Sequence, residues 1–135
     1  MQIIDTWQRS ASRLIAVAAG REAAELVVQN CRLVNVNSRE ILDGWEVAVV
    51  KGRFAYVGPN ATHCVGANTT VFDAKGKFII PGLCDGHMHI ESGMLTPAEF
   101  AAAVIPHGTT TMFTDPHEIA NVLGLSGVKT VSYTH

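Results

Sequence analysis

Two histidines, His87 and His89, are separated by one residue. Alternate side chains of an extended strand lie on one face, so both imidazoles would point the same way. Neighbouring imidazoles repel each other when both are protonated, whereas two neutral imidazoles can share a cation. The spacing therefore predicts a metal-binding pair. The alternative is two ordinary polar residues near a strand end, because an H-x-H pattern also arises by chance.

Glu91 follows two residues later and would share the histidine face if the strand continued that far. The open alternative is a loop carboxylate exposed to water. Gly82 and Gly86 would let the backbone pass closely. The histidines also fall where an apolar strand ends, which is the end at which α/β barrels carry their chemistry.

The stretch Asp115-Pro116-His117-Glu118 has a purely structural interpretation as a capping box. Asp115 would cap a helix, Pro116 suits its first turn, and Glu118 would reach back to the cap amide. That interpretation leaves His117 unexplained. His117 follows a predicted strand and would lie beside His87 and His89 if the two strands were neighbours.

Two strands and two helices are predicted in the second half of the chain, where these residues lie. Residues 79–90 form a buried strand interrupted by glycine. Thr96-Pro97-Ala98-Glu99 is a capping box that opens a helix over 97–105, which Gly108 closes. Residues 109–114 are β-branched and aromatic, which predicts a second strand, and a further helix runs to about Leu123. Strand–helix–strand–helix with short links predicts an α/β fold with a parallel sheet.

The first half of the chain has a different sequence pattern. Residues 3–24 are predicted to be helical, with Trp7, Leu14, Ile15 and Ala18 on an apolar face. Residues 25–80 read as a small β-sandwich-type unit with strands over 25–35, 45–50, 53–57 and 70–73, including a hairpin around Lys51-Gly52. We therefore expect three regions: an N-terminal helix (1–24), the β unit (25–80) and the start of an incomplete (β/α) barrel (81–135).

Composition excludes several classes of function. The apolar fraction is 47%, the charged fraction 16% and the net charge −2, without a basic stripe, so nucleic acid is a poor partner. Cys31, Cys64 and Cys84 form no C-x-x-C pair, which favours free thiols in the cytoplasm, with Cys84 as a small core residue. No segment has the roughly 20 apolar residues of a membrane span, and phosphate-loop, G-x-S-x-G and H-E-x-x-H motifs are absent from the sequence.

One long stretch resembles a known family. Residues 81–124 read PGLCDGHMHIESGMLTPAEFAAAVIPHGTTTMFTDPHEIANVLG. The PG-x-x-DGH-x-H part resembles the amidohydrolase superfamily in general, and HIES, MLTPAEF and DPHEIANVLG resemble the bacterial adenine deaminases within it. Residues 18–41, AAGREAAELVVQNCRLVNVNSREI, are similar to the family's N-terminal helix and first β-sandwich strands.

The resemblance implies hydrolytic deamination of adenine to hypoxanthine and ammonia at two divalent metals, manganese or iron. It implies that His87 and His89 ligate one metal, that His117 and Glu118 are candidate catalytic residues, and that Glu91 and Asp115 are candidate substrate-binding residues. It also implies a cytoplasmic enzyme of purine salvage or adenine catabolism, with adenine as partner and possible homo-oligomers at full length.

The sequence departs from the family's pattern in ways that bear on activity. Only two of eight barrel units are predicted, the later metal ligands are missing, and a single H-x-H is short of the three protein ligands usual in catalytic metal sites. We therefore expect a truncated barrel that is inactive alone. Two alternatives stay open: a cyclic-amide hydrolase of dihydroorotase or hydantoinase type, and a non-catalytic β module.

Overall fold

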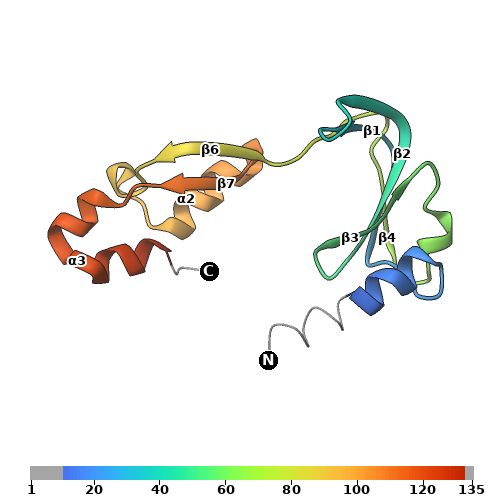
Figure 1. Ribbon diagram of the computed structural model, residues 1–135, viewed down its shortest axis with the longest axis horizontal. Helices are drawn as coiled ribbons and strands as arrows, with labels where there is room; N and C mark the ends of the chain where they lie inside the picture. Colours follow the sequence, from blue (N-terminus) through green and yellow to red (C-terminus); the bar gives the residue numbers. More distant parts are fainter. Residues whose placement is uncertain (1–10, 133–135) are drawn as a thin grey trace. The chain divides into compact units, whose positions relative to one another are not determined.

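The computed structural model describes residues 11–132, so Trp7 and the rest of the helix predicted before residue 11 lie outside the described residues. The chain divides into two compact units, Met1–Ile80 and Pro81–His135. Each has its own sheet (Figure 1).

The first unit is built on a five-stranded mixed sheet. Its strands are β1 (Leu26–Asn35), β2 (Glu40–Val50), β3 (Arg53–Gly58), β4 (Thr70–Asp73) and β5 (Phe78–Ile79). The order is β3-β2-β1-β4, and β5 also pairs with β1. β2 is antiparallel to β1 and β3, whereas β4 and β5 run parallel to β1. The described residues form one sheet here, so the two-layered sandwich stays a prediction.

The predicted hairpin between β2 and β3 is confirmed. Its two turn residues, Lys51 and Gly52, have φ of 52° and 66°. Positive φ at both central positions is typical of the tight turns whose twist matches that of paired strands.

A helical segment over residues 11–18 contributes to the core of the first unit, but with a different face from the one predicted. Val17 is fully buried, whereas Ile15 is 60% exposed. The buried cluster comprises Val17, Ala24, Val27, Ala48, Val50, Ala61 and Cys64, with Leu14 packed against it. Ile15 was therefore wrongly placed on the apolar face, because spacing alone leaves the exact rotation of a helix open by one position.

The second unit contains the parallel strand–helix–strand arrangement that the sequence predicts. β6 (Leu83–Met88) pairs in parallel with β7 (Thr109–Thr114), and α2 (Pro97–Val104) lies between them in the chain. Figure 1 shows β6 and β7 side by side and pointing the same way, with α2 along one face. The carboxyl ends of the two strands consequently meet at one edge.

The single strand predicted over residues 79–90 is wrong. Phe78 and Ile79 pair with β1 in the first sheet, and a new strand begins at Leu83 in the second. Pro81 separates them, because proline has no N–H to donate to a ladder and restricts the residue before it.

The helix predicted from the Thr96 capping box is confirmed. Thr96 Oγ1 accepts a hydrogen bond from Glu99 N at 3.3 Å, and Pro97 occupies the first turn. The last turn, η3 (Ile105–His107), is a 3₁₀ turn that ends at Gly108 with φ of 97°. A conformation of this kind favours glycine at a helix end.

The final helix, α3 (His117–Ser132), is broken at Gly124, whose φ of 59° and ψ of −146° are not helical. The predicted end near Leu123 therefore marks a real interruption, after which the helix resumes. No helix of residues 11–132 is long and apolar enough to span a membrane.

The second unit leaves most of its apolar side chains exposed. Among residues 81–132, Ile90 is the only apolar side chain that is buried, while Phe113, Val122 and Leu125 are 65%, 76% and 79% exposed. Cys84 is exposed as well, so its predicted core position is wrong.

Candidate functional site

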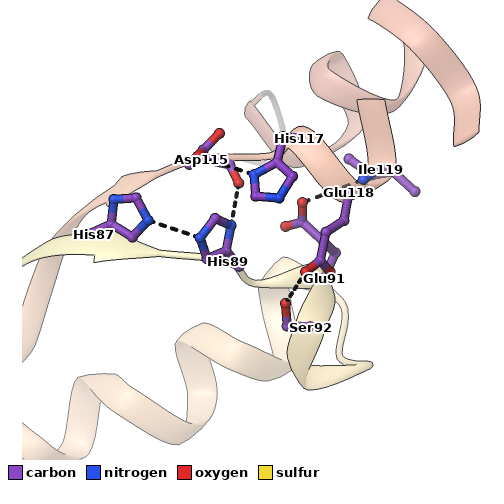
Figure 2. Close-up of polar contacts among 8 residues, drawn as sticks. All are labelled: His87, His89, Glu91, Ser92, Asp115, His117, Glu118 and Ile119. Atoms are coloured by element: carbon purple, nitrogen blue, oxygen red, sulfur yellow. Dashed lines mark hydrogen bonds and ion pairs between the residues drawn. The ribbon is translucent and has the colours of Figure 1, made fainter. Parts of the chain in front are cut away.

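The site lies just beyond the carboxyl ends of β6 and β7. The ladder continues one step past the strands, since Asp115 N donates to Met88 O at 3.0 Å. A 3₁₀ turn, η2 (Glu91–Gly93), follows β6, and α3 follows β7. Figure 2 shows the polar side chains of these segments gathered at this edge.

His87 and His89 come together as their spacing predicts. Their Nε2 atoms are 2.9 Å apart, and their ring centroids are separated by 4.7 Å with the planes at 71°. His87 is exposed and His89 is partly buried. The pairing register of β6 is irregular between Asp85 and Met88, so His87 reaches this position from a distorted strand.

A hydrogen bond to the main chain fixes the protonation pattern of His89. Its Nδ1 lies 2.7 Å from the carbonyl oxygen of Asp115. A carbonyl oxygen can only accept, so Nδ1 carries the hydrogen and the Nε2 of neutral His89 keeps a lone pair, which lies against Nε2 of His87. Such a partner on the far nitrogen is the usual way in which a metal-binding imidazole is oriented.

His117 is the third imidazole of the cluster. Its ring centroid is 4.7 Å from that of His89, with the planes at 80°. Its Nδ1 lies 3.1 Å from Oδ2 of Asp115. Asp115 therefore holds two imidazoles, one through its main chain and one through its carboxylate.

The residues present fit a divalent cation. His87, His89 and Asp115 each offer a ligand atom, and these atoms all lie within 4.8 Å of one another. Metal–nitrogen and metal–oxygen bonds are about 2.0–2.2 Å long, so two ligands of one ion lie at most about 4.4 Å apart, and these three atoms need no more than a small shift to share one ion. Two imidazoles with one carboxylate form a donor set that suits first-row divalent metals.

The capping box predicted at 115–118 is wrong. Within the described chain, the Asp115 carboxylate bonds the His117 ring and makes no bond to an amide of the first turn of α3. Glu118 Oε1 instead accepts a hydrogen bond from Ser92 Oγ at 2.8 Å. The Asp115 carboxylate thus bonds a ring of α3 itself, and the Glu118 carboxylate bonds a hydroxyl of η2.

Glu91 fits neither of the two predicted environments. The strand ends before it, and its side chain is partly buried in η2. Its Oε1 accepts from Ile119 N in a long contact of 3.5 Å, and its Oε2 is buried without a partner in the described chain. Ser92 was not singled out from the sequence, since nothing local to it shows that its partner lies 26 residues away.

Comparison with known proteins supports the resemblance stated from the sequence. The Amidohydrolase family model matches residues 78–133. Adenine deaminase 1 of Jannaschia sp. (strain CCS1) and the adenine deaminase of Ruegeria pomeroyi are each 65% identical over 124 residues, which cover 92% of this chain. The adenine deaminase of Clostridium botulinum is 52% identical over 123 residues, or 91% of this chain. The aligned part is 21% of the first two relatives and 20% of the third.

Solved structures show the same fold at lower sequence identity. Molinate hydrolase aligns with a TM-score of 0.55 and 24% identity over 79% of this chain and 28% of its own. A putative prolidase from Bifidobacterium longum aligns with a TM-score of 0.55 and 22% identity over 79% and 28% of the two chains. The chain is therefore related to the adenine deaminases of the amidohydrolase family, over a segment equal to about one fifth of their length.

Proposed function

We propose that this chain forms the start of an enzyme that hydrolyses adenine to hypoxanthine and ammonia. The observation that carries the proposal is the cluster of His87, His89 and Asp115 at the carboxyl edge of two parallel strands. This cluster lies in a segment that is 65% identical to adenine deaminases.

In this proposal, His87 and His89 are metal ligands, Asp115 is within reach of the same ion, and the cation is manganese or iron in a binuclear centre. The 2.9 Å separation of the two Nε2 atoms and the Asp115 carbonyl on His89 Nδ1 support the assignment. When bound, the cation supplies Lewis acidity for hydrolysis of a C–N bond.

Side chains of the protein would carry out the proton transfers. Deamination adds water at C6 of adenine and expels the amino group as ammonia, so one proton must leave the water and another must reach the amine. His117 suits this transfer, because its Nδ1 is held by Asp115 and its Nε2 has no hydrogen-bond partner among residues 11–132. Glu118, the next residue, is a second candidate for the same task.

Substrate binding falls to carboxylates in this proposal. Adenine presents N–H donors at its amino group and ring, and carboxylates accept such bonds. Glu91 has a buried oxygen without a partner in the described chain, which supports an acceptor role. Asp115 would contribute its remaining acceptor capacity beside His117.

The domain organisation is also proposed. The N-terminal helical segment, which ends at residue 18 and not at the predicted residue 24, would belong with residues 25–80 to one β-sandwich-type unit. Residues 81–135 would be the first two units of a (β/α) barrel. The exposure of Phe113, Val122 and Leu125 supports an incomplete barrel, because monomeric proteins rarely leave such surface uncovered. Free cysteines support a reducing compartment such as the cytoplasm.

A chimera tests the function within a complete enzyme. The 124 residues of this chain that match the Ruegeria pomeroyi adenine deaminase would replace their counterparts there, and ammonia release from adenine would be measured. We expect kcat/KM within about tenfold of the parent, or about 1.4 kcal/mol. His87→Ala with His89→Ala should abolish it, and His107→Ala, outside the cluster, is the matched control. A folded, metal-loaded chimera that releases no ammonia from adenine, or that has a higher kcat/KM for cyclic amides, contradicts the proposal.

A further inference from the structure

The first turn of α3 is held to η2 by two side-chain contacts that cross each other. Ser92 Oγ donates to Glu118 Oε1 at 2.8 Å, and Ile119 N donates to Glu91 Oε1 at 3.5 Å. Figure 2 shows Glu91 reaching toward α3 while Glu118 reaches back toward η2. We name these four residues, Glu91, Ser92, Glu118 and Ile119, the η2–α3 clasp.

The clasp replaces a local helix cap. The first N–H groups of a helix have no partner within the helix, and a capping side chain usually satisfies one of them. Asp115 is in the capping position by sequence, but its carboxylate bonds the ring of His117. Glu91, from another segment, accepts from the Ile119 amide instead.

The two hydrogen bonds of the clasp differ in length and in expected strength. The Glu91–Ile119 contact is long, and closing it leaves Oε2 of Glu91 buried and unpaired in the described chain, which is unfavourable. The Ser92–Glu118 bond is short and joins a hydroxyl to a carboxylate, which is the stronger kind of hydrogen bond. The Ser92–Glu118 bond is therefore the one able to keep the clasp closed.

Two residues of the clasp are also close in sequence to histidines of the imidazole cluster. Ser92 is three residues after His89, and Glu118 is the neighbour of His117. A bond between Ser92 and Glu118 therefore joins the segments that carry these two histidines, whose ring centroids are 4.7 Å apart. Opening the clasp would free the first turn of α3 and with it the position of His117.

We propose that Ser92 is a positioning residue: through Glu118 it keeps the first turn of α3 against η2 and so holds His117 beside His89. The role in holding α3 stands on these contacts alone. The consequence for catalysis rests on the proposed function.

Hydrogen exchange of the Ile119 amide in the 135-residue chain tests the clasp, because Ser92 does not itself contact that amide. In Ser92→Ala we expect exchange about 3–10-fold faster, the range for losing one modest hydrogen bond. Ser92→Thr, which keeps the hydroxyl, should restore the slow rate. Ser126→Ala, a serine later in the same helix, is the matched control. Amides of β1 and β2 report that each variant is folded.

An unchanged Ile119 rate in folded Ser92→Ala overturns the clasp. The catalytic consequence is tested in the chimera, where Ser92→Ala should lower kcat about 3–10-fold by the same estimate and Ser92→Thr should restore it. A faster Ile119 rate with unchanged kcat overturns the positioning role. If the chimera with Ser92 intact is inactive on adenine, the proposed function fails, and the exchange rates still decide the clasp.

Discussion

His89 and Asp115 are joined through the main chain, with Nδ1 of the imidazole 2.7 Å from the carbonyl oxygen of the aspartate. Because this oxygen belongs to the backbone, no single side-chain change at position 115 removes it. The bond points the Nε2 lone pair of His89 toward Nε2 of His87, 2.9 Å away. The relative orientation of these two imidazoles therefore depends on the pairing of the two strand ends.

The first prediction concerns which ring nitrogen of neutral His89 carries the hydrogen. Long-range ¹H–¹⁵N spectra of the chain at a pH where the imidazoles are neutral should show His89 with its hydrogen on Nδ1. Asp115→Ala should leave that pattern in place, because the carbonyl stays, while His117 loses its carboxylate partner. Finding the hydrogen on Nε2 of His89 would contradict the geometry.

The second prediction separates two neighbouring faces of the helical segment over residues 11–18. Val17 is fully buried and Ile15 is 60% exposed. Val17→Ala should lower the free energy of unfolding of the first unit by about 2 kcal/mol, since it leaves a cavity. Ile15→Ala should change it by less than about 0.5 kcal/mol. Urea unfolding followed by circular dichroism checks both, and equal effects would mean that the helix is rotated.

The third prediction concerns the three thiols. Burial raises the pKa of Cys31 and of Cys64, so each has less of the reactive thiolate at a given pH than an ordinary cysteine. Cys84 is exposed. A thiol reagent at pH 8 should therefore label Cys84 first, and Cys31 and Cys64 only after unfolding. Labelling of all three at one rate in the folded chain would contradict the assigned burial.

The fold could be predicted where the signal is local. Thr96-Pro97-Glu99 and Lys51-Gly52 formed the helix start and the hairpin expected of them, because their partners lie within a few residues. Asp115 and Glu118 fit a capping box equally well by spacing. The Glu118 side chain instead bonds Ser92, 26 residues away, which becomes its neighbour only after β6 and β7 pair. The Asp115 side chain bonds His117, two residues along, and spacing alone does not decide between that ring and the helix amides.

The candidate site was predictable in part for the same reason. His87, His89 and His117 could be expected together, since parallel strands bring their carboxyl ends to one edge. Ser92 could not, because its position depends on how the chain turns in η2. The core position of Cys84 was wrong because an apolar sequence neighbourhood does not reveal whether a second layer covers the strand.

Metal binding by the imidazole cluster can be measured by titrating the 135-residue chain with Co²⁺, followed by visible absorption and by calorimetry. We predict one site whose affinity falls by more than about 100-fold in His87→Ala with His89→Ala, which exceeds the roughly 10–100-fold cost of losing an outer-shell partner. His107→Ala, an exposed histidine outside the cluster, should bind as the parent does. Absence of binding, or binding that persists after the loss of both His87 and His89, would contradict a metal site at the imidazole cluster.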